Sequence, residues 1–334
     1  MGQSNKQHDS GADRRYGWRA VVPATSANLG CAFDCAGLAL NIHLKALFTP
    51  TDSDDLSLQF EGKTPERFPL DSSNLILRSL RLAADRLGAP RPRGHVAVDS
   101  DIPIGAGLGS SAAAVVAGLL LGARASGEDV KPSQLLCWAR EIEGHVDNAA
   151  AACQGGLVFA LGQGEGVTTV KAEFPEAIRI VVVTPVVEVL TTAAREVLPA
   201  TYSRADVVHT LQRTAILAAT CFSGRFELFP ELFDDKLHHP YRQTLVPGIE
   251  RCLRLRREGL LGVAISGSGS SVIAFARGNE VVIAHALEKI LADEGIQSQA
   301  LFTSADNNGA RVTREPVAWA EPSGRVLQKT ARLI

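Results

Sequence analysis

IGAGLGSSAAA, at residues 104–114, combines staggered glycines with two serines and a run of alanines. The stretch is open to three interpretations: a flexible linker, a closely packed helix start, or a cradle for phosphate. A linker would be followed by polar residues, but an apolar helix is expected at once, over 110–125. Close packing explains the alanines and leaves the glycines unexplained. Glycines let backbone N–H groups converge, serines supply hydroxyls and a helix N-terminus adds positive potential, so the residues favour an anion site.

Two familiar phosphate-binding patterns do not fit this stretch. The GxxxxGK[ST] pattern needs a lysine that is absent here. The GxGxxG fingerprint is not met either, because Gly105, Gly107 and Gly109 are spaced two and two. A phosphate bound here is therefore held without a loop lysine.

Composition limits the class of protein. The chain has 334 residues, 46% of them hydrophobic, which suits one large or two medium domains. A net charge of −2, with Lys and Arg spread along the chain, excludes a nucleic-acid partner. No apolar stretch reaches the roughly 18 residues of a membrane span, and the polar N-terminus is no secretory signal. The six cysteines form no CxxC pair and no zinc pattern, so we expect reduced thiols in a cytoplasmic protein.

Strand-like and helix-like segments alternate along the chain, which predicts a mixed α+β fold. Apolar or alternating runs predict strands at 18–22, 43–48, 56–60, 95–98, 156–161, 178–183, 262–265, 272–276 and 298–303. Helical periodicity predicts helices at 72–87, 110–125, 132–143, 203–220, 247–257 and 281–292. We expect a disordered tail over 1–16 and domains over 17–170 and 171–310, with a C-terminal extension over 311–334. The domain boundary falls at a turn-rich hairpin, LGQGEGVTTV at 161–170.

Three motifs in order resemble those of the GHMP kinases, over most of the chain from Trp18 to Thr303. The central one is PIGAGLGSSAA at 103–113, and VVPATSANLGCAFDCAGLAL at 21–40 is similar to the first motif of the homoserine kinase branch. AISGSGSSVIAF at 264–275 is similar to the C-terminal glycine motif. EGHVDN at 143–148, LTTAAREVLP at 190–199 and LHHPYRQTLVPG at 237–248 support that branch. The resemblance implies a ribosomal-protein-like α/β N-terminal domain, a ferredoxin-like C-terminal domain, ATP and Mg²⁺ as cofactors, and phosphorylation of L-homoserine in threonine biosynthesis.

The resemblance also assigns site residues. The loop implied to hold the ATP phosphates consists of Pro103, Ile104, Gly105, Ala106, Gly107, Leu108, Gly109, Ser110, Ser111 and Ala112. Mg²⁺ would be bound by a hydroxyl of Ser110 or Ser111 and by Glu143, with Glu141 as the alternative; the serines can also cap the helix. Homoserine would be held by Asn28, Asp34, His145, Thr191, Arg195 and Arg242, with Asp34 on its ammonium and the two arginines on its carboxylate. Asn148 stands where other branches place an aspartate base, so we expect direct attack by the hydroxyl, with Asn148 and Arg195 as the catalytic residues.

Some positions depart from the pattern of that branch and leave the acceptor open. Cys31-Ala32 stands where Pro-Gly is usual, Val146 replaces a proline, Ala149-Ala150-Ala151 replaces Val-Ala-Pro, and Ser270-Ser271 replaces Pro-Thr. Ala32 adds a Cβ where the backbone could need glycine. Another small hydroxy-amino acid or alcohol as the acceptor, or a non-catalytic ATP or amino-acid sensor, remain the alternatives. A homodimer is the assembly common in this branch.

Overall fold

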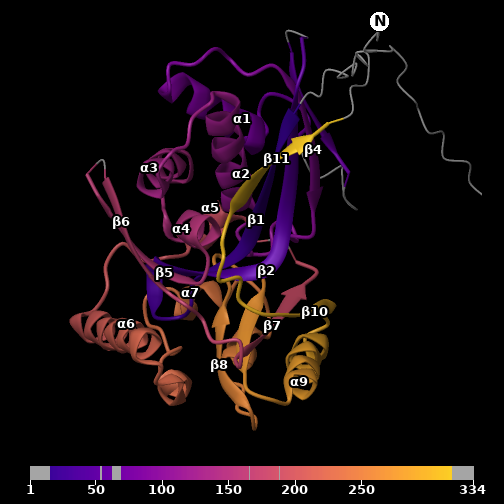
Figure 1. The fold of residues 1–334 in the computed structure, drawn as a ribbon. Coiled ribbons are helices and arrows are strands. Elements are labelled where there is room, and N and C mark those ends of the chain that lie inside the picture. Colours follow the sequence, from indigo (N-terminus) through magenta and orange to yellow (C-terminus); the bar gives the residue numbers. More distant parts are fainter. Residues whose placement is uncertain (1–15, 53–54, 62–68, 165, 188, 318–334) are drawn as a thin grey trace, which may run out of the picture.

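A computed structural model describes residues 16–52, 55–61, 69–164, 166–187 and 189–317. Residues 1–15 of the tail predicted over 1–16, and residues 318–334 of the predicted extension, lie outside the described residues, whereas Tyr16 begins the first strand. Two antiparallel-rich sheets and their helices make up the molecule (Figure 1). The α+β class predicted from the alternation of elements is confirmed.

The first sheet is seven-stranded, with β5 pairing β2 and β6 pairing β5 beside the path β11-β1-β2-β4-β3. Neighbouring strands are antiparallel except β3 and β4, which are parallel. The strands are β1 (Tyr16–Asn28), β2 (Ala32–Pro50), β3 (Leu56–Phe60), β4 (Gly94–Ser100), β5 (Leu157–Gln163), β6 (Gly166–Ala172) and β11 (Arg311–Pro316). The predicted boundary at 170/171 therefore falls inside β6, and the predicted extension supplies an edge strand of this sheet.

Helix α2 (Ser110–Ala125) lies in the centre of the first half, packed against β1 and α1 (Leu75–Arg86). Its small residues let the two helices approach closely. A Cβ on Gly118 would lie 2.3 Å from the carbonyl oxygen of Ile76, and one on Gly122 would lie 2.3 Å from that of Leu80. Helices α3 (Pro132–Glu143) and α4 (Asp147–Gln154) pack beside α2. This packing holds the N-terminus of α2, and the glycines before it, in one position.

The second sheet has the order β10-β7-β9-β8 and is buried on both faces. Along its strand β7, Val181 and Val183 point into a core beneath α9 (Glu280–Asp293), whereas Ile180 and Val182 point into the main core. Its strands are β7 (Arg179–Pro185), β8 (Leu260–Ile265), β9 (Val272–Ala276) and β10 (Ser298–Thr303). The remaining helices are α5 (Thr191–Glu196), α6 (Arg204–Ser223), η2 (Phe226–Glu231), α7 (His239–Arg242), α8 (Ile249–Leu253) and α9 (Glu280–Asp293).

Several predicted elements differ in extent from those observed. Strands β1 and β2 extend well beyond the predicted 18–22 and 43–48, because β1 continues past Pro23 through an irregularity in register. The helix predicted over 247–257 is only α8, since Gly248 adopts a left-handed conformation at its start and the helix ends at Leu253. In the described residues, no helix is long and apolar enough to cross a membrane. All six cysteines are free, with Cys31, Cys221 and Cys252 buried and the others half-buried.

Candidate active site

The glycine loop reaches α2 through backbone conformations that favour glycine. Gly105, Gly107 and Gly109 have φ of 67°, 72° and 66°. A Cβ on Gly109 would lie 1.9 Å from Thr25 Oγ1, and one on Gly107 would lie 2.2 Å from the carbonyl oxygen of Ser266. Gly109 is the N-cap of α2, and no side chain caps the first turn. The serines thus do not cap the helix, and its N-terminus presents backbone N–H groups and positive potential to the solvent side.

The three sequence motifs meet at this loop. Ser266, in the turn between β8 and β9, donates its hydroxyl to the carbonyl oxygen of Gly107 at 2.7 Å. The backbone N–H of Ser271 donates to the carbonyl oxygen of Ala106 at 3.3 Å. The backbone N–H of Gly267 donates to the carbonyl oxygen of Ala27 at 3.1 Å. The C-terminal glycine motif is therefore a support that fixes the loop and the end of β1.

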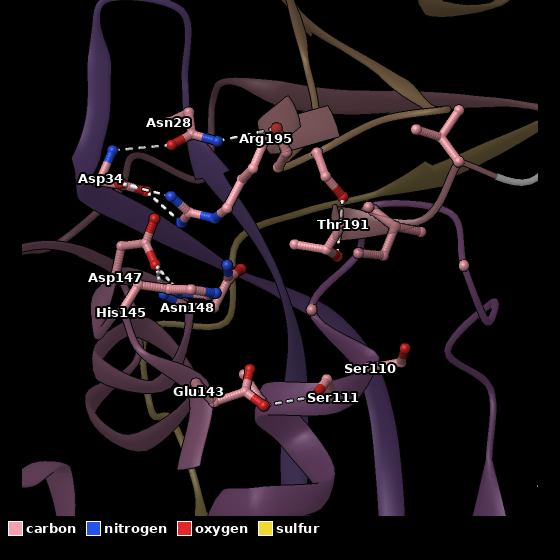
Figure 2. A pocket seen from close by; sticks show the side chains of 18 of the residues that line it. Asn28, Asp34, Ser110, Ser111, Glu143, His145, Asp147, Asn148, Thr191 and Arg195 are labelled. Atoms are coloured by element: carbon pink, nitrogen blue, oxygen red, sulfur yellow. Dashed lines mark hydrogen bonds and ion pairs between the residues drawn. The ribbon is translucent and has the colours of Figure 1, made fainter. Parts of the chain in front are cut away.

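A cavity of about 280 Å³ opens between the loop, α4, α5 and α7. Figure 2 shows its side chains, with the Asp34–Arg195 pair at one end and the Ser111–Glu143 pair at the other. The sequence-predicted residues that line it are Asn28, Asp34, Gly105, Gly107, Leu108, Gly109, Ser110, Ser111, Ala112, Glu143, His145, Asn148, Thr191, Arg195 and Arg242. Pro103, Ile104 and Ala106 are the predicted loop residues that do not line it. Residues as far apart in the sequence as Asn28 and Ser268 thus form one site.

At the end of the cavity next to the glycine loop, a serine hydroxyl and a glutamate carboxylate face each other. Ser111 donates its hydroxyl to Glu143 Oε1 at 2.6 Å, and Ser110 lines the same wall. Glu141, the alternative carboxylate, instead forms an ion pair with Arg86 at 2.5 Å. Within the described segments, no group of three or more His, Cys, Asp or Glu could hold a metal ion. Mg²⁺ binds through oxygen ligands and few protein carboxylates, so a hydroxyl and one carboxylate beside a phosphate cradle fit it.

At the other end, Arg195 forms a two-pronged ion pair with Asp34. Its Nη1 and Nη2 donate to the two carboxylate oxygens at 3.1 and 2.9 Å, and this pairing raises the pKa of Arg195. Asn28 holds Asp34 from the other side, because its Oδ1 accepts the Asp34 backbone N–H at 3.0 Å. The Asn28 amide group then donates to the carbonyl oxygen of Gly267 at 2.9 Å. A carboxylate and a guanidinium are thereby fixed at this end of the cavity.

Arg242 is a buried cation on the cavity wall. Its Nε donates to the carbonyl oxygen of Ala194 and its Nη1 to that of Gly267, both at 3.0 Å. Its guanidinium lies over the Phe33 ring, 5.1 Å from the centroid. It forms no ion pair with any carboxylate of the described residues. Burial lowers its pKa to about 10, so a bound carboxylate would supply the counter-charge that the protein omits.

Two further polar side chains line the centre. His145 Nδ1 lies 2.8 Å from Asp147 Oδ1, and this hydrogen bond raises the pKa of His145. Asn148 Oδ1 accepts a hydrogen bond from the Thr25 hydroxyl at 2.7 Å. The Asn148 amide nitrogen is therefore the end of that side chain left for a ligand.

The sequence prediction missed several residues of this site. Ser268 lines the cavity 3.5 Å from Thr191, hydroxyl to hydroxyl, although its motif had been noted. Thr25 lay in the first motif, but nothing in the pattern marked its side chain. Ile142, Asp147, Val189 and Gly267 also line the cavity. Their roles depend on contacts between distant segments, which periodicity and spacing do not reveal.

The positions that depart from the branch pattern lie outside the cavity lining. Cys31, Ala32, Val146, Ser270 and Ser271 do not line it. Among described residues other than glycine, positive φ occurs at Asn28, Leu29, Asp34 and Asn279. The expectation that position 32 could need glycine is therefore wrong: Ala32 begins β2 without a left-handed conformation.

Comparisons with known proteins give a consistent picture. The chain matches the family models for the GHMP kinases N terminal domain over residues 74–156 and the GHMP kinases C terminal over residues 216–293. It is 37% identical to a homoserine kinase of Solibacter usitatus over 88% of this chain and 96% of that protein. A homoserine kinase of Deinococcus radiodurans is 36% identical over 87% of this chain and 95% of that protein.

Solved structures match the fold as well. The crystal structure of homoserine kinase from Cytophaga hutchinsonii has a TM-score of 0.80 at 27% identity, covering 94% of this chain and 99% of that one. A mevalonate kinase structure has a TM-score of 0.64 at 16% identity, covering 87% of this chain and 99% of that one, which shows likeness of fold alone. The two-domain GHMP kinase fold expected from the motifs is confirmed.

Proposed function

This chain belongs to the homoserine kinase family of the GHMP kinases, and we propose that it transfers the γ-phosphate of ATP to the side-chain hydroxyl of L-homoserine. The product is O-phospho-L-homoserine, an intermediate of threonine biosynthesis. The observation that carries the proposal is Arg242, a buried guanidinium that faces the cavity without a carboxylate partner. The carboxylate of an amino-acid acceptor would pair with this unpartnered guanidinium. Mevalonate lacks the ammonium of homoserine, and a sugar lacks both the ammonium and the carboxylate.

The acceptor binds, in this proposal, at the end of the cavity away from the loop. Arg242 and Arg195 hold its carboxylate, and Asp34 holds its ammonium. Because Asp34 and Arg195 pair with each other across 2.9 and 3.1 Å, a zwitterion enters between opposite charges that are already in place. Thr191 and His145 line the same cavity and contact the rest of the acceptor.

The loop binds ATP through its backbone. The N–H groups at the start of α2, uncapped by any side chain, and the loop glycines surround the phosphates. Ser110 or Ser111 and Glu143 would hold Mg²⁺. When bound, Mg²⁺ would neutralise charge on the phosphate oxygens that it contacts.

The residues act mainly by positioning and charge. The acceptor hydroxyl attacks the γ-phosphorus, the new O–P bond forms, and the bond to the β-phosphate oxygen breaks, while the hydroxyl proton passes to the transferred phosphoryl group. Asn148 cannot take that proton, because an amide is not a base at neutral pH; its amide nitrogen donates to the acceptor oxygen or to the phosphoryl group. Arg195 adds positive charge and orientation at the same end.

The first test is ADP release by the purified protein with Mg²⁺-ATP and a panel of acceptors: L-homoserine, L-threonine, L-serine, mevalonate and galactose. Turnover chiefly with L-homoserine supports the proposal. L-Homoserinol, which keeps the ammonium and hydroxyl but lacks the carboxylate, should bind poorly and leave Arg242 without its partner. Preference for another acceptor would replace homoserine by a different small alcohol. ATP binding without ADP release from any acceptor would favour a sensor.

The proposal also includes the cellular compartment in which the enzyme acts. The six free cysteines suit a reducing compartment, so we place the activity in the cytoplasm. The homodimer expected from the resemblance stays a prediction.

A further inference from the structure

Two neighbouring residues at the start of β2 each contact one of the two arginines of the cavity. Asp34 forms the two-pronged ion pair with Arg195. Phe33, one position earlier, contacts Arg242 instead, with the guanidinium carbon Cζ 5.1 Å from the centroid of the ring. The Phe33 side chain is half-buried and does not itself line the cavity. One arginine is therefore paired with a carboxylate and the other with an aromatic ring.

The hydrogen bonds of Arg242 leave one nitrogen of its guanidinium group free. Its Nε donates to Ala194 and its Nη1 to Gly267, and both acceptors are backbone carbonyl oxygens. Nη1 also lies 3.5 Å from Nδ1 of His238. Within the described residues, Nη2 and its N–H groups have no hydrogen-bond partner. Those N–H groups are therefore available to the carboxylate of a ligand.

An aromatic ring suits Arg242 better than a carboxylate of the protein would. The face of a phenyl ring carries negative potential and attracts a guanidinium, most strongly where both groups are shielded from water. Arg242 is only 4% exposed. A carboxylate in place of the Phe33 ring would neutralise the guanidinium and repel the carboxylate of an acceptor. The ring therefore stabilises the cation and leaves its charge for the acceptor.

The Phe33 ring is held in turn by His238. The two ring centroids are 5.2 Å apart at an interplanar angle of 25°, so the rings are stacked. His238 is fully buried, and its Nε2 lies 2.8 Å from the carbonyl oxygen of Gly30. Phe33, His238 and Arg242 thus form a cluster in which each side chain contacts the other two. This stacking restricts the orientation of the ring that Arg242 contacts.

We propose that Phe33 is a positioning residue for acceptor binding: its ring holds Arg242 in the orientation that presents Nη2 to the carboxylate of the acceptor. This inference rests on the proposed function, in which Arg242 binds that carboxylate. Phe33 does not line the cavity, so it acts through Arg242 and not on the reacting atoms. Loss of the ring should therefore weaken binding of the acceptor and leave the transfer step nearly unchanged.

Phe33→Leu removes the aromatic face and keeps an apolar side chain. We expect the KM for L-homoserine to rise about 5- to 30-fold, with kcat and the KM for ATP changed less than about twofold. L-Homoserinol lacks the carboxylate, so its kcat/KM should change less than about twofold in the same variant. Phe159→Leu, at a half-buried phenylalanine of β5 outside the cavity, is the matched control and should leave these constants unchanged. Equal losses of kcat/KM with L-homoserine and L-homoserinol in Phe33→Leu would overturn the proposal.

A fluorinated ring separates electrostatic attraction from packing. Phe33→trifluorophenylalanine nearly keeps the shape of the side chain and removes most of the negative potential of the ring face. The KM for L-homoserine should rise as it does in Phe33→Leu. Phe33→Tyr, which keeps the ring face, should stay within about threefold of the wild-type KM. A wild-type KM in the fluorinated variant would overturn the proposal.

Nuclear magnetic resonance of the Arg242 Nε–H group tests the contact without turnover. Arg242→Lys identifies the signal, which the ring current of Phe33 should displace. Phe33→Leu should therefore move it, and Phe159→Leu should not. A signal that moves no further in Phe33→Leu than in Phe159→Leu would overturn the proposal even if the wild type uses L-homoserine. A wild type that releases no ADP with L-homoserine would overturn the proposed function, and the same signal then decides separately whether Phe33 orients Arg242.

Discussion

The hydroxyl of Thr25 donates to Asn148 Oδ1 at 2.7 Å, and the backbone N–H of the same Thr25 donates to the carbonyl oxygen of Leu108 at 3.0 Å. One buried residue of β1 thus contacts both the glycine loop and the polar side chain at the centre of the cavity. Its hydroxyl decides which end of the Asn148 amide faces the ligands. Thr25 is a positioning residue in this arrangement.

Replacing Thr25 by Val keeps the shape of the side chain and removes its hydroxyl. Asn148 then loses a hydrogen bond that contributes about 1 kcal/mol, and its amide can turn over. We expect kcat to fall about 10-fold or more, with the KM for ATP changed less than threefold. Thr25→Ser, which restores the hydroxyl, should recover most of kcat. Equal losses in Thr25→Val and Thr25→Ser would mean that the methyl group, and hence packing, matters more than the hydrogen bond.

Arg195→Lys tests the two-pronged pair with Asp34. A lysine keeps the charge but cannot donate in parallel to both carboxylate oxygens, nor grip the acceptor in the same plane. Loss of a charge-assisted hydrogen bond of about 1.5–3 kcal/mol predicts a 10- to 100-fold rise in the KM for homoserine. Steady-state kinetics with each substrate varied in turn should leave the KM for ATP unchanged. Arg179→Lys, exposed in β7, is the control, and an equal rise in both KM values for Arg195→Lys would contradict acceptor-specific binding.

Gly109→Ala separates backbone strain from steric conflict. Gly109 has φ of 66°, and its added Cβ would lie 1.9 Å from Thr25 Oγ1. Gly127 has a similar φ of 80°, but nothing lies within 4 Å of its added Cβ. Gly127→Ala should therefore lower the free energy of unfolding by about 1–2 kcal/mol, the cost of the left-handed conformation alone. Gly109→Ala should cost about 1–3 kcal/mol more, measured by urea denaturation, because β1 or the loop must move.

Enzyme activity is a second measurement that distinguishes Gly109→Ala from Gly127→Ala. Gly109→Ala should also lose most of its kcat/KM for ATP, since the shifted loop no longer surrounds the phosphates. Gly127→Ala should remain fully active at a temperature where it is folded. If the two variants lost equal stability and kept equal activity, the loop would not be as closely held as these contacts require.

Much of the fold could be predicted because its central elements carry clear patterns. The helices at 110–125 and 132–143 and the strands at 56–60, 272–276 and 298–303 have the predicted bounds. Strand β11, RVTREP, was missed because an exposed edge strand needs no apolar alternation. Strand β1 was cut short at Pro23, where a break in register accommodates the proline within the sheet.

The candidate site, like the fold, was predicted only in part from the sequence. The glycine loop could be predicted from the sequence, since spacing, serines and the following helix all pointed to an anion site. Thr25 could not be predicted, because its partner Asn148 is 123 positions away. The pairing of Asp34 with Arg195, 161 positions apart, was also beyond reach: both had been assigned to the acceptor, but not to each other.

The buried His238 makes stability depend on pH. Its Nε2 lies 2.8 Å from the carbonyl oxygen of Gly30, and burial lowers its pKa to about 4. Between about pH 6.5 and pH 4 the unfolded chain binds a proton at this position and the folded chain does not, so unfolding takes up a proton. The free energy of unfolding therefore decreases as pH falls through this range, by up to about 1.4 kcal/mol per pH unit from His238 alone. His238→Gln keeps an amide donor for Gly30 and removes the titration. Urea denaturation at several pH values should give a shallower slope for this variant than for the wild type or for the exposed control His285→Gln, and an unchanged slope would contradict a neutral His238 in the folded protein.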